Sequence, residues 1–282
     1  MLDLQKILQK VRHLKPISGV VHQVLALANN SECEISDLVK LVEHDPSIVA
    51  NLLKACNSAF FALPVKVDSI QHAVSMLGLH QVAELVLAQE IAGHVAKAQN
   101  GYGLDKGGLW KHSVASAMLA RTLAEQRSLL NLSAIYTAAL LKDIGKIILH
   151  DHVRSLQGEI KSVLQAKNYD FIEAEKECIG LDHATLGAII AHKWNFSPQM
   201  VRMIGNHHLT NSEARNDPAI ASVYVADMVG MLSGNCIGID KLAYHVYEDI
   251  FKDFFHAKID LKALIIIYNG FVDNALRLRL QA

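Results

Sequence analysis

Apolar residues recur at intervals of three and four positions along most of the chain. The spacing is clear in three groups: Leu38, Leu41 and Val42; Val49, Leu52 and Leu53; and Met118, Leu119 and Leu123. Residues at this spacing share one face of an α-helix, whereas a half-buried strand would alternate apolar and polar residues. No long alternation of that kind occurs in the sequence. The pattern therefore predicts an all-α fold.

Proline and glycine mark the ends of the predicted helices. A residue with a capping side chain stands directly before a proline in three places: Asp45-Pro46, Ser197-Pro198 and Asp217-Pro218. The capping oxygen can accept a hydrogen bond from a backbone N–H group of the first turn, and proline suits the first helical position. Each pair predicts a helix start. Gly78 and Gly145 lie where we expect helices to stop.

The helical pattern breaks at residues 97–108, KAQNGYGLDKGG, which contain four glycines and few apolar side chains. Such a composition is typical of a connection. We place a lobe boundary there, between an N-terminal helical lobe of residues 1–96 and a second helical lobe of residues 97–282. Because 51% of the 282 residues are hydrophobic, we expect the two short lobes to share one core.

Composition argues against several classes of protein. The 27 Lys and Arg residues nearly balance the 28 Asp and Glu residues and form no basic run, so we expect no nucleic-acid partner. The apolar stretches are too short, or too often interrupted by charges, to cross a bilayer. Residues 1–16 read as a short amphipathic helix and lack a small-residue cleavage site after a continuous apolar stretch. We expect a cytoplasmic protein that does not enter the membrane.

The cysteines indicate neither a zinc ribbon nor a disulfide framework. They are scattered along the chain at Cys33, Cys56, Cys178 and Cys236, and no two of them form a C-x-x-C pair. We expect all of them to be buried, reduced thiols.

Residues of the metal-binding types gather in the second lobe. They are His112, Asp143, His183, His207, His208 and Asp227, each on a predicted helix or at the end of one. Imidazole nitrogens and carboxylate oxygens together suit iron, manganese, zinc or nickel. One such histidine alone would mean little, but the ordered set within one helical lobe predicts a metal-type cluster.

A long stretch of the first lobe carries a family resemblance. The features are the HDP turn at residues 44–46, the CNSAFF run at 56–61 and the SIQHAVSMLGL helix at 69–79. In this order they resemble the HDOD family, the HD-related output domains of bacterial signalling proteins. The resemblance begins near Leu14 and continues through an HD-like part to about Asp227. The second lobe is thus expected to be HD-like, and residues 228–282 match little.

The resemblance also implies how the metal-type residues would be divided. In two-metal HD hydrolases one ion is held by the histidine of the HD motif together with an earlier histidine and a late aspartate. The residues of this chain at the latter two positions are His112 and Asp227. The HD aspartate, Asp143, bridges to a second ion that is held by three later histidines, which here are His183, His207 and His208. The position of the HD histidine is Lys142 in this chain.

An ammonium group has donors and a fixed positive charge but no lone pair, so Lys142 should repel a metal. The first ligand set is therefore incomplete and the second complete, which predicts a degenerate site with about one ion per chain. The Lys142 ammonium could neutralise Asp143 and Asp227 in place of the missing ion. In the alternative without metal, His183 and His207 donate hydrogen bonds to Asp143 in a polar pocket.

Several other polar residues have simpler explanations. We expect His150-Asp151-His152, despite its literal HD dipeptide, to be solvated. His192 should point away from the cluster, because nine residues of helix separate it from His183. Lys146 could contact a substrate phosphate or face solvent. In the first lobe we expect Asn57 and Ser58 to cap backbone groups and Phe60 and Phe61 to lie in the core.

Hydrolysis by two metals needs both ions, so a disabled first position predicts a poor catalyst or none. The leading hypothesis is a non-catalytic signalling or regulatory domain of HDOD type, with an optional single metal that is structural or sensory. The alternative is a metal-dependent phosphohydrolase that acts on a nucleotide, including a cyclic dinucleotide, through one ion. A third hypothesis is a nucleotide receptor without turnover. The expected partner is an unidentified signalling protein or a nucleotide ligand, and the sequence leaves the oligomeric state open.

Overall fold

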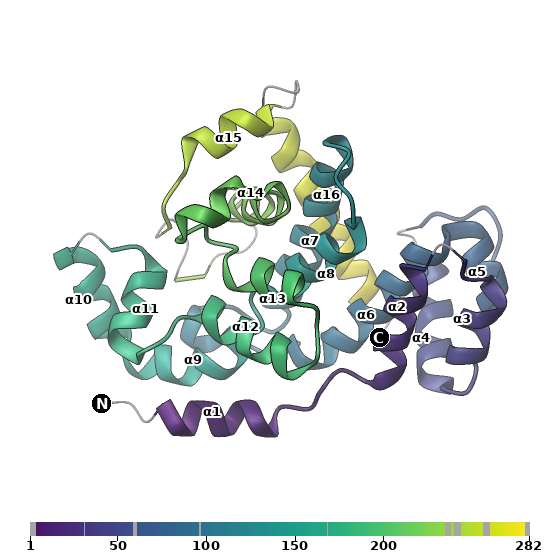
Figure 1. The fold of residues 1–282 in the computed structure, drawn as a ribbon, viewed down its shortest axis with the longest axis horizontal. Coiled ribbons are helices and arrows are strands. Elements are labelled where there is room, and N and C mark those ends of the chain that lie inside the picture. The colour runs from purple at the N-terminus through teal and green to yellow at the C-terminus, as the bar shows by residue number, and fades with distance from the viewer. Residues whose placement is uncertain are drawn as a thin grey trace. The chain divides into compact units, whose positions relative to one another are not determined.

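In a computed structural model, the described part of the chain consists of helices joined by turns and loops (Figure 1). The described residues are 4–30, 32–58, 61–95, 97–167, 169–234, 238–239, 244–255 and 260–279. Across these ranges no strand forms, and an isolated bridge joins Gln99 to Leu104. The predicted all-α class is confirmed. None of these helices is long and apolar enough to cross a membrane.

The chain divides into two compact units. The larger contains residues 1–16 and 94–272, and the smaller contains residues 17–93 and 273–282. Every residue predicted to form the metal-type cluster belongs to the larger unit. The core shared between the two sequence lobes stays a prediction.

The smaller unit is built from short helices whose ends follow the predicted signals. Its helices are α2 (Gly19–Ala28), α3 (Ile35–Val42), α4 (Pro46–Cys56), α5 (Ile70–Leu77) and most of α6 (Leu79–Val95). Asp45 caps α4 by accepting hydrogen bonds from the backbone of Ser47 and Ile48 at 3.0 and 3.1 Å. Gly78 ends α5 with a positive φ of 82°.

Asn57 caps the other end of α4, as predicted. Its side-chain amide donates to the Leu53 carbonyl at 2.8 Å, and its oxygen accepts from the Val67 backbone at 2.8 Å. The Ser58 hydroxyl is buried without a hydrogen-bond partner, so the capping role predicted for this residue is wrong. Phe61 is half-buried in the following turn, and Phe60 lies outside the described residues.

The larger unit holds the remaining helices, with α16 as far as Val272. They are α1 (Leu4–His13), η1 (Asn100–Tyr102), α7 (Gly108–Gln126), α8 (Leu132–Leu141), α9 (Lys146–Ser155), α10 (Gln157–Lys167), α11 (Phe171–Ile179), α12 (His183–Lys193), α13 (Pro198–Gly205), η2 (Ser212–Asn216), α14 (Pro218–Leu232), α15 (Glu248–Phe255) and α16 (Leu261–Arg279). Helix α7 packs against α8 and α14, while α13 packs against both α8 and α12. The predicted starts at Pro198 and Pro218 are confirmed, with Ser197 and Asp217 as caps.

A tight turn at Gly145 sets the spacing between α9 and α12. Helix α8 already ends at Leu141, and Gly145 directly precedes α9, so the predicted helix stop at this glycine is wrong. A Cβ atom at Gly145 would lie 2.1 Å from the backbone oxygen of His183. Only glycine allows this approach, which brings the segment after α8 against the first residue of α12.

The cysteines differ in part from the prediction. Cys56 is buried in α4, but Cys33 and Cys178 are only half-buried because they lie in the loop before α3 and in the last turn of α11. The expectation that all the thiols are buried is therefore wrong for these two. Cys236 lies outside the described residues.

Candidate metal centre

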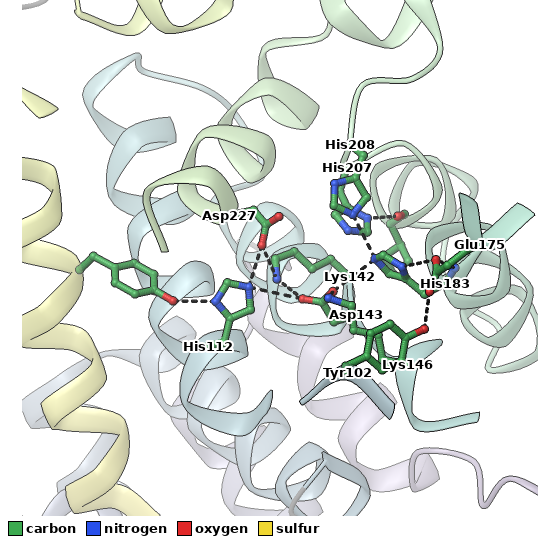
Figure 2. A network of polar contacts seen from close by, with 12 residues as sticks. Tyr102, His112, Lys142, Asp143, Lys146, Glu175, His183, His207, His208 and Asp227 are labelled. Carbon is green, nitrogen blue, oxygen red and sulfur yellow. Dashed lines mark hydrogen bonds and ion pairs between the residues drawn. The ribbon is translucent and has the colours of Figure 1, made fainter. Parts of the chain in front are cut away.

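Five segments bring the predicted ligands together (Figure 2). The cluster consists of His112 on α7, Lys142 and Asp143 after α8, His183 at the start of α12, His207 and His208 after α13, and Asp227 on α14. All of these side chains are buried. Their ligand atoms form two groups, each with atoms within 4.8 Å of one another: His112, Asp143 and Asp227, and His183, His207 and His208. The structure thus unites all six residues predicted from the sequence.

Lys142 lies between the two carboxylates of the first group. Its Nζ atom forms an ion pair with Asp143 Oδ2 and lies 2.8 Å from Asp227 Oδ1 (Figure 2). The side chain is fully buried, at 0% exposure. Burial lowers the pKa of Lys142, but Asp143 and Asp227 outweigh it, so that its pKa is raised above the ordinary value. The lysine is therefore a buried cation held by two anions.

A second ammonium completes the charge balance. Lys146 Nζ lies 2.9 Å from Asp143 Oδ1, and the Lys146 side chain is buried, so the alternative in which it faces solvent is wrong. Burial alone would raise the pKa of Asp143 and of Asp227. Lys142, Lys146 and His112 reverse this effect at Asp143, and Lys142 and His112 reverse it at Asp227, so that both pKa values lie well below the ordinary range. Two ammonium groups thus face two carboxylates.

His112 connects the first group to the C-terminal helix. Its Nε2 atom lies 2.7 Å from Asp227 Oδ1 and 3.6 Å from Asp143 Oδ2. Its Nδ1 atom lies 2.8 Å from the hydroxyl oxygen of Tyr268, which comes from α16. Both ring nitrogens therefore have polar partners within the protein.

A buried carboxylate orients His183. Glu175 Oε2 lies 2.7 Å from His183 Nδ1 and accepts a 3.0 Å hydrogen bond from the His183 backbone, while the Tyr102 hydroxyl donates to Glu175 Oε1. Burial lowers the pKa of His183, but Glu175 outweighs this effect and the pKa is raised. The free end of the ring, Nε2, points to His208 Nε2 at 3.0 Å and to Asp143 Oδ1 at 3.5 Å.

The two histidines after α13 have buried nitrogens without protein partners. His207 Nδ1 donates to the Ile204 carbonyl at 2.7 Å, which leaves a lone pair on its buried Nε2 atom. The His208 ring stacks on the Tyr244 ring with 4.3 Å between the ring centroids. The Nδ1 atom of His208 is also buried without a hydrogen-bond partner. Burial lowers the pKa of His207 to about 4, and burial together with His207 lowers the pKa of His208 well below the ordinary value.

The two groups differ in their fit to a metal ion. In the second group, His183 and His207 each use Nδ1 for a carboxylate or carbonyl and keep Nε2 for the interior, which is the arrangement of metal-ligating histidines. The orphaned His207 Nε2 atom supports the same fit. In the first group an ammonium stands between the carboxylates, and that arrangement does not fit an ion. The alternative without metal predicts that His183 and His207 both donate to Asp143. His183 Nε2 lies 3.5 Å from Asp143 Oδ1, but His207 donates to the Ile204 carbonyl instead, and its Nε2 atom has no hydrogen-bond partner among the described residues.

The residues expected to lie outside the cluster do so. Asp151 and His192 are exposed, and His150 and His152 are only half-buried. A further group of possible ligands, Asp170, Glu173 and His245, has a simpler role. Asp170 and Glu173 form a capping box at the start of α11, which explains their proximity.

Sequence reasoning missed the partners of the ligands. These are Tyr102, Glu175, Tyr244 and Tyr268. Tyr102 lies in the glycine-rich connection, where a loop was expected, and Tyr268 lies in the part of the sequence that matched little. Glu175, eight residues before His183, carries no signal in the sequence that separates it from a surface glutamate.

Comparison with known proteins identifies the fold. A family model described as the HDOD domain matches residues 14–210. An uncharacterized protein of Treponema pallidum is 23% identical over 224 residues, which cover 79% of this chain and 43% of that protein. The chain thus spans less than half the length of this curated relative.

Three solved structures are similar over nearly the whole chain. A Shewanella amazonensis protein named "Putative phosphohydrolase" is 23% identical, with a TM-score of 0.70 and coverage of 98% of this chain and 97% of that one. An HDOD domain protein of Geobacter sulfurreducens is 19% identical, with a TM-score of 0.74 and 99% coverage of both chains. A Marinobacter aquaeolei protein named "Putative signal transduction protein" is 19% identical, with a TM-score of 0.70 and coverage of 95% and 59%. Because the sequence identities are below 25%, these similarities show a shared fold and nothing about function.

Proposed function

Because the chain belongs to the HDOD family, we propose that it is a signalling or regulatory domain that does not hydrolyse phosphodiesters. The observation that carries this proposal is the Lys142 ammonium between Asp143 and Asp227. In two-metal HD hydrolases the first ion would lie between these two carboxylates, where the Lys142 ammonium lies in this chain. The partner is a signalling protein or a nucleotide ligand, and the proposed location is the cytoplasm.

The charge balance supports the absence of the first ion. The Lys142 and Lys146 ammonium groups already neutralise the two carboxylates of the first group. A divalent ion would have to displace Lys142 and leave its ammonium buried without a partner, which is costly in a protein interior. Without that ion, the site could not activate a water molecule between two metal ions, as hydrolysis by two metals requires.

The second group supports a single bound ion. His183, His207 and His208 would supply imidazole nitrogens. Asp143, whose Oδ1 atom lies 3.5 Å from His183 Nε2, would add a carboxylate oxygen, and the set suits iron, manganese, zinc or nickel. Bound there, the ion would supply a structural or sensory link between α12 and the segment after α13. Glu175 would hold the His183 ring with Nε2 toward the ion. We propose about one ion per chain.

A second candidate function is a phosphohydrolase or phosphodiesterase with one ion, acting on a nucleotide or cyclic dinucleotide. The three imidazoles favour it, because three protein ligands with an open position are typical of catalytic metals. Both oxygens of Asp143 are held by lysines, however, so this carboxylate is poorly placed to act as a base toward water. The same geometry would serve a nucleotide receptor without turnover.

Elemental analysis of protein purified without added metal, together with a phosphodiesterase assay, separates these functions. We expect about one ion per chain, no turnover of cyclic dinucleotides or generic phosphodiesters, and a lower melting temperature after chelation, since metal bound only by the folded state stabilises it. Two ions with turnover would overturn the proposal. One ion with turnover would favour the second candidate.

Lys142→His tests the residue that carries the proposal. The new imidazole would join His112 and Asp227 and complete the first ligand set, so metal content should rise by about one ion per chain. Lys142→Gln is the matched control, because it also removes the charge but supplies a poor ligand, and its metal content should stay at the parent value. Equal metal content in the parent and in Lys142→His would show that Lys142 does not exclude the ion.

A further inference from the structure

Helices α12 and α13 form a groove on the surface of the larger unit. Its volume is about 580 Å³, and its lining comes from the second half of α12, the turn that follows and α13. Ala188 and Gly205 belong to this lining, and a Cβ atom at Gly205 would lie 3.0 Å from the Ala188 Cβ atom. Because both residues are small, the two helices approach closely and no long side chain at either position fills the hollow.

The groove combines apolar and basic side chains. Val201 and Phe196 belong to its lining, together with the exposed residues His192 of α12 and Arg202 of α13. None of the described residues that line it is acidic. Arg202 lies 3.9 Å from Asp217, and these two side chains are 54% and 27% exposed. An ion pair this long and this exposed contributes little stability, so the guanidinium can exchange Asp217 for another carboxylate.

The N-terminal helix adds positive charge beside the end of α12. The Lys193 ammonium donates to the backbone carbonyls of Val11 and Arg12 at 2.6 and 2.7 Å, which holds the end of α1 next to the last turn of α12. The described residues of α1 include no acidic side chain, and Arg12 and His13 are exposed in its last turn. The net charge of the whole chain is only −1, so this positive charge is a local feature.

An apolar hollow between two helices, with basic groups beside it, is complementary to an acidic segment that offers an apolar side chain. A nucleotide fits this groove less well, because its base would need an exposed aromatic face. Phe196, the only Phe, Tyr or Trp in the described lining, is 9% exposed. The two basic side chains also come from different helices and do not form the compact set of donors that a phosphate prefers.

We propose that this groove binds an acidic segment of a partner protein, with an apolar side chain in the hollow and carboxylates on Arg202 and His192. The inference rests on the proposed function and deepens it, because it specifies the chemistry of the signalling partner. Helix α12 begins with His183, and His207 and His208 follow α13. A partner in the groove therefore contacts the two helices that carry the imidazoles of the second group.

Selection of short random peptides, displayed on phage, against the immobilised full chain tests this chemistry. We expect enriched peptides that combine an apolar residue with Asp or Glu and bind more weakly as the ionic strength rises. Nitrogen-15 NMR of the full chain with one enriched peptide should show shifts at the Gly205 backbone and the Asn195 side-chain amide, which line the groove. Basic or uncharged peptides, shifts confined to other surfaces, or no enrichment at all would overturn the proposal.

Three variants test the binding of the selected peptide. Arg202→Gln should weaken it about tenfold, the effect of losing one hydrogen bond to a charged group. Ala188→Leu should also weaken it, because the larger side chain fills the hollow. Lys161→Gln is the matched control, since it makes the same change of charge at an exposed residue of α10 and should leave the affinity at the parent value. Equal affinity in the parent and in Arg202→Gln would overturn the proposal.

The same NMR signals report other occupants of the groove. Shifts at Gly205 and Asn195 on addition of AMP would assign the groove to a nucleotide, and shifts on concentrating the chain alone would assign it to a second copy. Either result would overturn the proposal. Failure of the proposed function is a separate observation, because two ions with turnover would leave the peptide affinities of these variants unchanged.

Discussion

A buried ammonium and a divalent ion can neutralise the same carboxylates with different chemical consequences. Lys142 reaches Asp143 and Asp227 through N–H donors. Unlike an ion, it has no open coordination position and cannot bind or activate water. Removing one partner of a buried ion pair costs about 3–5 kcal/mol, because the other charge stays buried. One side chain thus both stabilises the cluster and removes the chemistry expected of it.

The buried imidazoles should make the stability of the protein depend on pH. Burial lowers the pKa of His207 to about 4, although Asp143 and Asp227 oppose the shift, whereas the unfolded chain takes up this proton near pH 6.5. Between these values the unfolded state binds more protons, so stability falls as the pH falls through this window. His183, with its raised pKa, acts in the opposite direction and gains stability at low pH.

We predict that His207→Gln loses less stability than the parent between pH 7 and pH 5, by about 2 kcal/mol. Urea unfolding of chelator-treated protein at the two pH values measures the difference. At pH 5 the carboxylates with depressed pKa are still ionised in both states, so the imidazoles dominate. His192→Gln, an exposed change on α12, should keep the parent's pH dependence. An equal loss in the parent and in His207→Gln would show that His207 does not cause it.

Single residues also show what the sequence could and could not predict. Lys142 and the six metal-type residues could be found because their types and order are themselves the signal. Tyr268 could not, since its partner His112 is 156 residues away, and neither residue type predicts the pairing. The bond between Tyr102 and Glu175 spans 73 residues in the same way.

At the scale of elements, the start of α12 determines where His183 lies. Asp182 caps the helix by accepting hydrogen bonds from the Thr185 backbone and hydroxyl, both at 2.7 Å. Gly145 lets the preceding segment approach the same turn. The helix starts with proline could be predicted, because their signal is local. The need for glycine at position 145 could not, because it arises from a neighbour that only the tertiary fold supplies.

We predict that Asp182→Ala lowers stability by about 1 kcal/mol and weakens metal binding, because the first turn of α12 carries His183. Asp45→Ala is the matched control. It removes an equivalent cap from α4 in the smaller unit and should cost a similar amount of stability without affecting the metal. Chemical denaturation and a metal titration of both variants measure the two effects. Metal affinity at the parent level in Asp182→Ala would show that the bond from the His183 backbone to Glu175 is sufficient to place the histidine.

At the scale of the molecule, the part of α16 up to Val272 contributes to the larger unit's core, although the family model matches only residues 14–210. Leu264, Tyr268 and Val272 on α16 are all buried, and Tyr268 reaches the polar cluster. Helical spacing predicted the all-α class because it reports that one face of each helix is buried. It does not report which other helix buries that face, and for this reason no role of α16 could be predicted.

We predict that a chain ending at residue 260 does not fold into the parent structure. The truncation removes three large buried side chains of α16, those of Leu264, Tyr268 and Val272, and leaves His112 without the Tyr268 hydroxyl. Deleting a large buried side chain costs about 2–5 kcal/mol, so three such losses are comparable with the 5–15 kcal/mol that typically stabilise a domain. Near-ultraviolet circular dichroism and thermal unfolding should show lost tertiary packing and a broad transition. The full-length Tyr268→Phe variant, which keeps the apolar contacts of α16, should still unfold cooperatively. If the truncated chain melted as sharply as the parent and at the same temperature, α16 would be an accessory to a core that residues 1–260 complete alone.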